Sequence, residues 1–338
     1  MLEDIEKKRK MALDVLKPSA HDLEHGLELH RSSLVWDAYG FAPGGTLPVE
    51  LMHRIVDSGM GRDEKIDLLE QTRQVDSFKD PDMWAEAVEA WNAAGVDCIF
   101  QNAGVEGNAI NQLIKRLSRF TWMADKHSGH FKRAPFPENV QKAREEGLHS
   151  LYLTTNGVPL PDSQSSVEEA LYYFTVFFQL GVRMMHLTYN RRNLIGDGCA
   201  ETSDAGLSDF GRAVVAEMNR VGVIPDISHS GQRTSLEAAR ASGKPVVASH
   251  SVAGVLSSHY RAKGDAVVKA LADSGGYIGV CAISSLPYGL WKNRCAIGPC
   301  GISREKIWRR PCCHWLGWRT PVRTAACLYP NAEAQAHL

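Results

Sequence analysis

Two histidines occupy matching positions in the sequence, each directly after a short apolar run. His229 follows the run 223–227, and His250 follows the run 245–248. If both runs are neighbouring parallel strands, the two imidazoles end at the same edge of the sheet and converge. Two neutral imidazoles at adjacent strand ends suit a divalent transition metal, whereas one histidine alone more often bonds loop backbone. The pair therefore predicts a metal site with His229 and His250 as ligands.

Arg261 follows His250 in a polar loop. A guanidinium on a loop above a barrel mouth suits a carboxylate, which it binds through forked hydrogen bonds. The other interpretation is an ordinary surface arginine. We expect His186, within a predicted strand, to face the core or the helices, and His259 to be solvated.

The elements that must position these residues alternate along the chain. Apolar runs near residues 34, 96, 150, 182, 223, 245 and 277 predict about seven strands. Helical spacing and capping signals predict helices over 63–75, 82–94, 107–125, 137–147, 170–180, 208–222, 236–241 and 265–272. This order predicts an α/β fold, a TIM-like (β/α)8 barrel that is incomplete at its C-terminal end. The alternative, a dinucleotide-binding sheet, is not favoured, because no G-x-G-x-x-G motif follows a predicted strand.

The composition is that of a globular enzyme and excludes several partners. The 338 residues are 44% hydrophobic and 23% charged, with a net charge of −1, so no global charge favours nucleic acid or membrane binding. The first ten residues mix both signs without an apolar core, and no run of 18 apolar residues occurs. We therefore expect a cytoplasmic protein without nucleic-acid or membrane partners; a homodimer is one possible assembly.

The composition changes abruptly near residue 284. Residues 284–338 hold five of the eight cysteines and four of the eight tryptophans, and no aspartate follows Asp273. A zinc module would need regularly spaced Cys and His pairs, and a disulfide cluster would need an export signal. The third interpretation, a shifted reading frame, fits the change best. We therefore expect 1–283 to form a barrel domain without its last strand, and 284–338 to be an anomalous segment, frameshifted or disordered.

Several motifs in the second half of the body resemble the membrane (renal) dipeptidase family. The resemblance is continuous from about 178 to 282 and is carried by Gly181-Val182-Arg183, Leu187-Thr188-Tyr189-Asn190, Asp197-Gly198, Gly206-Leu207-Ser208-Asp209-Phe210-Gly211, Asp226-Ile227-Ser228-His229, Ser249-His250-Ser251, His259-Tyr260-Arg261 and Gly275-Gly276-Tyr277-Ile278-Gly279-Val280. The resemblance implies a zinc-dependent hydrolase with one or two ions in the mouth of a (β/α)8 barrel. It places His229 and His250 on metal ligands and Arg261 on the group that holds the substrate carboxylate.

The chain departs from the family pattern at several ligand positions. Tyr39 and Phe41 stand where the family has a His-x-Asp pair, and Asn156 replaces its bridging glutamate. Tyr189 replaces a substrate-contacting histidine, so we expect Tyr189 and Asn156 to contact the substrate. The aspartate after the last strand has no counterpart.

These departures limit the metal site. Because a catalytic zinc normally has three protein ligands, at most one Zn²⁺ looks supportable here. Asp37 could be a substitute ligand, or it could cap the loop after the first strand. The predicted function is a metal-dependent hydrolase of dipeptides or related small amides; the alternative is a non-catalytic or truncated relative with a degraded metal site.

Overall fold

The computed structural model describes residues 2–42, 44, 47–104, 110–160, 166–281 and 323–324. The anomalous segment predicted over 284–338 therefore lies outside the described residues, apart from 323–324. The strands are β1 (Val35–Gly40), β2 (Cys98–Asn102), β3 (Phe131–Arg133), β4 (His149–Thr155), β5 (Val182–His186), β6 (Ile224–Asp226), β7 (Ala248–Ser251), β8 (Ile278–Val280) and β9 (Arg323–Thr324). Each expected strand has a counterpart, and β3 was missed because three residues carry no periodic signal.

The strands form one curved parallel wall. The larger sheet has the order β6-β5-β4-β2-β1-β9, β3 pairs with β4, and β7 pairs with β8. A parallel bridge between Asp226 and Val247 joins the two sheets. The wall curls into a half-barrel, as the sequence predicted, and brings the ends of β5, β6 and β7 next to each other.

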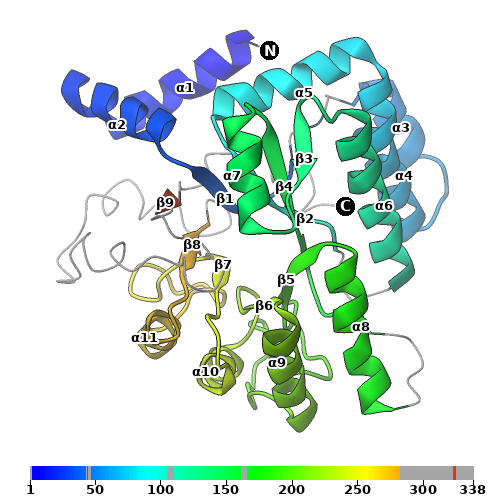
Figure 1. Cartoon of the computed structure of the whole chain (residues 1–338), viewed down its shortest axis with the longest axis vertical. Coiled ribbons are helices and arrows are strands. Elements are labelled where there is room, and N and C mark those ends of the chain that lie inside the picture. Colours follow the sequence, from blue (N-terminus) through cyan, green and yellow to red (C-terminus); the bar gives the residue numbers. More distant parts are fainter. Residues whose placement is uncertain are drawn as a thin grey trace.

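The helices are α1 (Leu2–Leu16), α2 (Ala20–Ser32), α3 (Val49–Val56), α4 (Arg62–Gln71), α5 (Pro81–Ala94), α6 (Ile110–Lys126), α7 (Pro137–Glu145), α8 (Val167–Gln179), α9 (Asp209–Val221), α10 (Gln232–Ala241) and α11 (Asp265–Asp273). Helices α1 and α2 project away from the wall near β1, whereas the other helices lie around it (Figure 1). Helix α9 shows why these boundaries hold. The Ser208 side chain accepts from the amide of Gly211 at its start, and Gly222 is left-handed at its end. None of the described helices has the length and apolar character needed to cross a bilayer.

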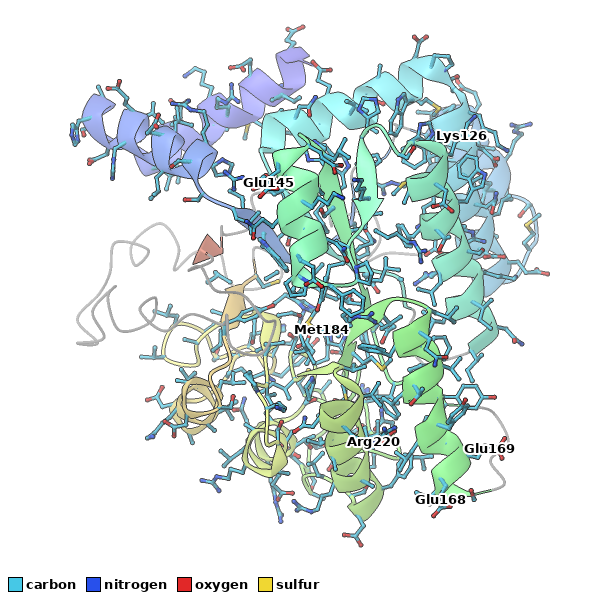
Figure 2. All side chains as sticks on the ribbon, in the orientation of Figure 1. Lys126, Glu145, Glu168, Glu169, Met184 and Arg220 are labelled. Carbon is cyan, nitrogen blue, oxygen red and sulfur yellow. The ribbon has the colours of Figure 1, made fainter. Side chains whose placement is uncertain are left out.

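The sheet is buried on both faces. Successive side chains along each strand point to opposite faces and join different apolar clusters. Ile99, Leu151 and Leu153 belong to the large cluster that the helices cover. Phe100 and Tyr152, one residue away, belong to a second cluster on the inner side of the wall. Met184 on β5, also of that cluster, lies near the middle of the molecule, whereas Glu168 and Glu169 on α8 lie at its lower edge (Figure 2). Two filled faces keep the wall rigid enough to position the groups at its rim.

Trp91 offers a test of this packing. The side chain is fully buried on α5, and its ring lies 4.9 Å from that of Phe131 between ring centroids. We expect Trp91→Ala to lower the free energy of unfolding by about 3–5 kcal/mol, because it leaves a cavity between helix and sheet. Urea unfolding measures this loss. Tyr172→Ala, at an exposed aromatic, should change stability by no more than about 0.5 kcal/mol, and equal effects of the two variants would contradict the packing described.

Candidate functional site

The structure brings the two predicted histidines together at the rim of the wall. His229 lies in the loop after β6, and His250 lies within β7. Their Nε2 atoms are 3.0 Å apart, and their ring centroids are 5.0 Å apart. The approach follows from strand pairing, because the amide of Ile227 donates to the carbonyl of Val247 and fixes the two strand ends side by side.

Both imidazoles are held from their other nitrogen. Nδ1 of His229 lies 2.7 Å from Oδ1 of Asn190, and Nδ1 of His250 lies 2.8 Å from Oγ of Ser249. Burial, followed by the nearby positive charge of Arg261, lowers the pKa of both histidines well below the usual value. The two rings are therefore neutral at physiological pH, which is the form that binds metal.

A third histidine also reaches this site, contrary to the expectation for His186. It is the last residue of β5 and is fully buried, with its ring centroid 5.2 Å from those of His229 and His250. Its Nε2 atom lies 2.8 Å from Oδ2 of Asp226 without the alignment of a hydrogen bond. His186 and Asp226 are paired in register at the ends of β5 and β6, so comparing strand ends across the sequence could have found them.

Asp226 is a buried anchor for the rim. Its carboxylate accepts from the amide and hydroxyl of Ser228 and from the amide and hydroxyl of Ser249. Although burial raises the pKa of Asp226, the charge and proximity of His186 outweigh that effect and lower it far below the usual range. His186, Asp226 and His250 offer ligand atoms within 4.8 Å of one another. Because four donors already engage the Asp226 carboxylate, we assign it to holding the loops rather than to binding metal.

Two tyrosines stack on the two histidines. The Tyr39 ring lies 4.2 Å from the His250 ring at an angle of 7°, and the Tyr189 ring lies 4.0 Å from the His229 ring at 16°. The Tyr39 hydroxyl donates to Oδ1 of Asn156. Tyr39, Tyr189 and Asn156, which stand where the family pattern has other residues, thus surround the histidine pair with two aromatic rings and one amide.

Phe41 and Asp37 lie differently. The Phe41 side chain is half exposed. Asp37 is buried, and its Oδ1 accepts from the amide of Tyr39. A Cβ at Gly40 would lie 2.4 Å from Asp37 Oδ2, so the carboxylate is packed against the backbone of the last residues of β1.

Arg261 lies beside the histidine pair. Its guanidinium is largely buried, and Nη2 donates to the His250 carbonyl at 3.0 Å. Among the described residues, its Nε has no hydrogen-bond partner and no carboxylate forms an ion pair with it. A buried guanidinium with unused donors can receive an external carboxylate.

Lys263 connects the loop of Arg261 to that of His229, and the sequence gave no signal for it. It is fully buried, and its Nζ donates to the Ser230 carbonyl at 2.7 Å and to the Ser235 hydroxyl at 3.2 Å. Burial lowers the pKa of Lys263 to about 8.

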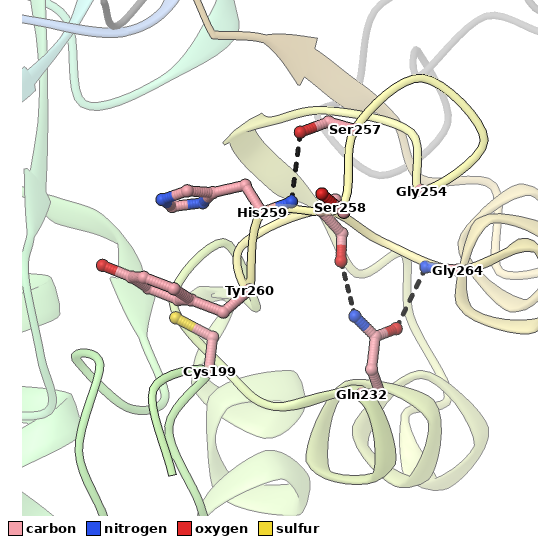
Figure 3. Close-up of a pocket in the computed structure, with 9 residues that line it drawn as sticks. Cys199, Gln232, Gly254, Ser257, Ser258, His259, Tyr260 and Gly264 are labelled. Atoms are coloured by element: carbon pink, nitrogen blue, oxygen red, sulfur yellow. Dashed lines mark hydrogen bonds between the residues drawn. The ribbon is translucent and has the colours of Figure 1, made fainter. Parts of the chain in front are cut away.

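An open pocket of about 470 Å³ lies along the loop that carries Arg261 and Lys263 (Figure 3). Gln232 spans it by donating to the Ala262 carbonyl and accepting from the Gly264 amide. The lining residues are Cys199, Gln232, Gly254, Ser257, Ser258, His259, Tyr260, Ala262 and Gly264. His259, expected in solvent, is half-buried here, and its Nδ1 accepts from the amide of Arg261.

A protein-family model described as membrane dipeptidase, peptidase family M19, matches residues 46–289. The chain belongs to the membrane dipeptidase family. The match confirms the resemblance found in the sequence, and it includes His229, His250 and Arg261. Membership in this family implies a metal ion.

Similar proteins agree with this assignment. The dipeptidase tcpJ of Claviceps purpurea is 32% identical over 166 residues, which are 48% of this chain and 36% of that protein. The crystal structure of an amidohydrolase from Pseudomonas aeruginosa is 28% identical with a TM-score of 0.55, covering 75% of this chain and 64% of that one. The probable dipeptidase PvdM from the same organism shares the fold at 21% identity and a TM-score of 0.58, covering 78% and 63%. The chain thus spans less than two thirds of the length of each of these proteins.

The buried ammonium of Lys263 predicts a specific pH dependence of stability. Its pKa is about 8 in the folded protein and about 10.4 in an unfolded chain. Between these values the unfolded state binds the extra proton, so rising pH favours the folded state. Relative to Lys263→Met, the wild type should gain about 3 kcal/mol in unfolding free energy from pH 7.5 to 10.5.

Urea unfolding across this pH range measures the gain. Lys269→Met, which changes a solvent-exposed lysine on α11, should run parallel to the wild type. If the unfolding free energy of Lys263→Met also ran parallel to that of the wild type across this pH range, the lowered pKa of a buried Lys263 would be contradicted.

Proposed function

We propose that this protein is a metal-dependent hydrolase of dipeptides or related small amides. The observation that carries the proposal is the 3.0 Å approach of the Nε2 atoms of His229 and His250 beside the buried guanidinium of Arg261, whose Nε has no hydrogen-bond partner among the described residues. The family and the dipeptidase names of its relatives support the same activity.

The residues present fit one zinc ion. Zinc binds imidazole nitrogen at about 2.0–2.1 Å, and two nitrogens 3.0 Å apart can both contact one ion at that distance. Among the described residues, the positions at which this chain departs from the family pattern offer no ligands for a second ion, because the Tyr39 hydroxyl and the Asn156 carbonyl oxygen are hydrogen-bonded to each other and Phe41 has no ligand atom. We therefore propose a single Zn²⁺ held by His229 and His250.

Asp37 is the carboxylate candidate for a third protein ligand. Its Oδ1 accepts the Tyr39 amide of the same strand, which directs that oxygen to the backbone of β1 rather than to a metal. Holding the end of β1 is therefore the role that its contacts support better, and Asp37→Asn should then leave zinc affinity unchanged.

A zinc ion bound here supplies a Lewis acid that activates water and polarises the amide carbonyl. The chain's own residues orient the substrate. Arg261 binds its carboxylate, and Tyr189, stacked on His229, forms a wall beside it. Asn156 uses its oxygen for Tyr39, which leaves its amide NH₂ group to donate to the substrate.

Metal content and hydrolysis test the proposal together. After zinc loading and gel filtration, we expect about one zinc per chain, and we expect hydrolysis of members of a dipeptide panel. His250→Ala should lose the zinc and reduce kcat/KM at least about 100-fold, because His229 would be the one proposed ligand left to hold the ion. His25→Ala, at an exposed histidine of α2, is the control that should change neither.

Two results would contradict the proposal. A zinc-loaded wild type that carries well under one ion per chain would remove the metal site. A stoichiometric zinc protein that cleaves no dipeptide would favour the non-catalytic relative instead.

Arg261 predicts how the substrate is bound. Arg261→Met should raise KM about 10- to 100-fold with little change in kcat, since a charge-assisted hydrogen bond contributes about 1.5–3 kcal/mol to binding. Dipeptide amides, which lack the carboxylate, should be cleaved equally well by wild type and variant. An equal loss on both substrates would show that Arg261 acts through structure and not through the carboxylate.

A further inference from the structure

We infer that Asn190 and the Ser249–Asp226 pair are positioning residues that fix the tautomers of His229 and His250. Each holds the Nδ1 atom of one ring as the proton donor, so that both Nε2 lone pairs point at the same place. The inference rests on the proposed metal site and adds the residues that build it.

The chain of donors at His250 leaves one assignment. Asp226 is held as a carboxylate and has no proton to give, so the Ser249 hydroxyl must donate its single hydrogen to Oδ2. Ser249 Oγ can then only accept from His250 Nδ1, 2.8 Å away. His250 therefore carries its proton on Nδ1, and its Nε2 is a bare lone pair.

Asn190 makes the same assignment at His229. The carbonyl oxygen Oδ1 of its side chain lies 2.7 Å from His229 Nδ1, and an amide oxygen only accepts. The backbone of Asn190 is left-handed, with φ 57°, a conformation that asparagine tolerates better than most residues. A Cβ at Gly198 would lie 2.1 Å from the Asn190 carbonyl carbon. Glycine at 198 is thus required for the chain to hold Asn190 in this position.

These two tautomers determine what lies between the two imidazole rings. The two Nε2 atoms face each other at 3.0 Å, and neither carries a hydrogen in the neutral form. Two lone pairs at that distance repel, and a cation that both can ligate relieves the repulsion. Stacking of Tyr39 on His250 and Tyr189 on His229 restricts rotation of the rings away from each other. The two-histidine site is therefore preorganised, which compensates for its small number of ligands.

Metal affinity tests Asn190 independently of activity. Cobalt(II) titration of the metal-free protein, followed by its absorption spectrum, should give Asn190→Ala a 10- to 100-fold weaker affinity than the wild type, the usual effect of losing a partner to a ligating histidine. Asn190→Asp keeps an acceptor and a side chain suited to the left-handed backbone, so it should bind at least as tightly as the wild type.

Asn193→Ala is the matched control. Asn193 lies in the same loop, and its side chain also bonds backbone, donating to the Leu187 carbonyl and accepting from the Ile195 amide. It does not contact a histidine nitrogen in these bonds. General loosening of the loop would weaken cobalt binding in both alanine variants equally, and that outcome would overturn the inference.

Proton NMR of the zinc-loaded protein reads the tautomers directly. With ¹⁵N-labelled histidine, we expect two Nδ1–H signals from the zinc ligands in the wild type and in Asn193→Ala. Loss or rapid exchange of one signal is expected in Asn190→Ala, and of the other in Ser249→Ala. Nε2–H signals from His229 or His250 in the zinc form would overturn the inference, whereas a wild type that binds neither metal would overturn the proposed function itself.

Discussion

The buried carboxylate of Asp226 is the group on which the rim of the barrel depends. It ends β6, receives hydrogen bonds from Ser228 and Ser249, and lies 2.8 Å from His186 at the end of β5. One carboxylate thereby ties together the ends of three strands. A charge buried this deeply costs several kcal/mol unless donors surround it, and these donors fix the loop that carries His229 and the strand β7 that carries His250.

Where the family pattern has other residues, this chain has the aromatic residues Tyr39 and Tyr189, which lie around His229 and His250. Tyr39 does not leave a gap where a ligand is expected; it stacks on His250 and bonds to Asn156. Tyr189 stacks on His229 in the same way. The two imidazoles are therefore enclosed by aromatic rings, with the Arg261 guanidinium beside them, and this arrangement is what our proposal of a smaller metal centre rests on.

The interpretation of residues 284–338 as foreign to the barrel is our proposal from composition. Within this segment, the backbone of Arg323–Thr324 pairs with β1 in parallel register. On the other side of the wall, a Cβ at Gly279 of β8 would lie 3.0 Å from that of Ala38 on β1. Both contacts are made by β1, the strand at which a closed barrel joins its first and last strands.

The sequence by itself determined the class of fold, the positions of the strands and the pair His229 and His250, because apolar runs that end in polar residues repeat along the chain. It also identified the departures at Tyr39, Asn156 and Tyr189. It missed β3, which is too short for periodicity, and it did not place the buried His186 next to the histidine pair, because the direction of that side chain depends on the neighbouring strand. Only the tertiary structure decided that Asn190, Asp226 and Lys263 meet the site. Their contacts join loops 20 to 40 residues apart in sequence, and local pattern carries no information about which distant loop a side chain will reach.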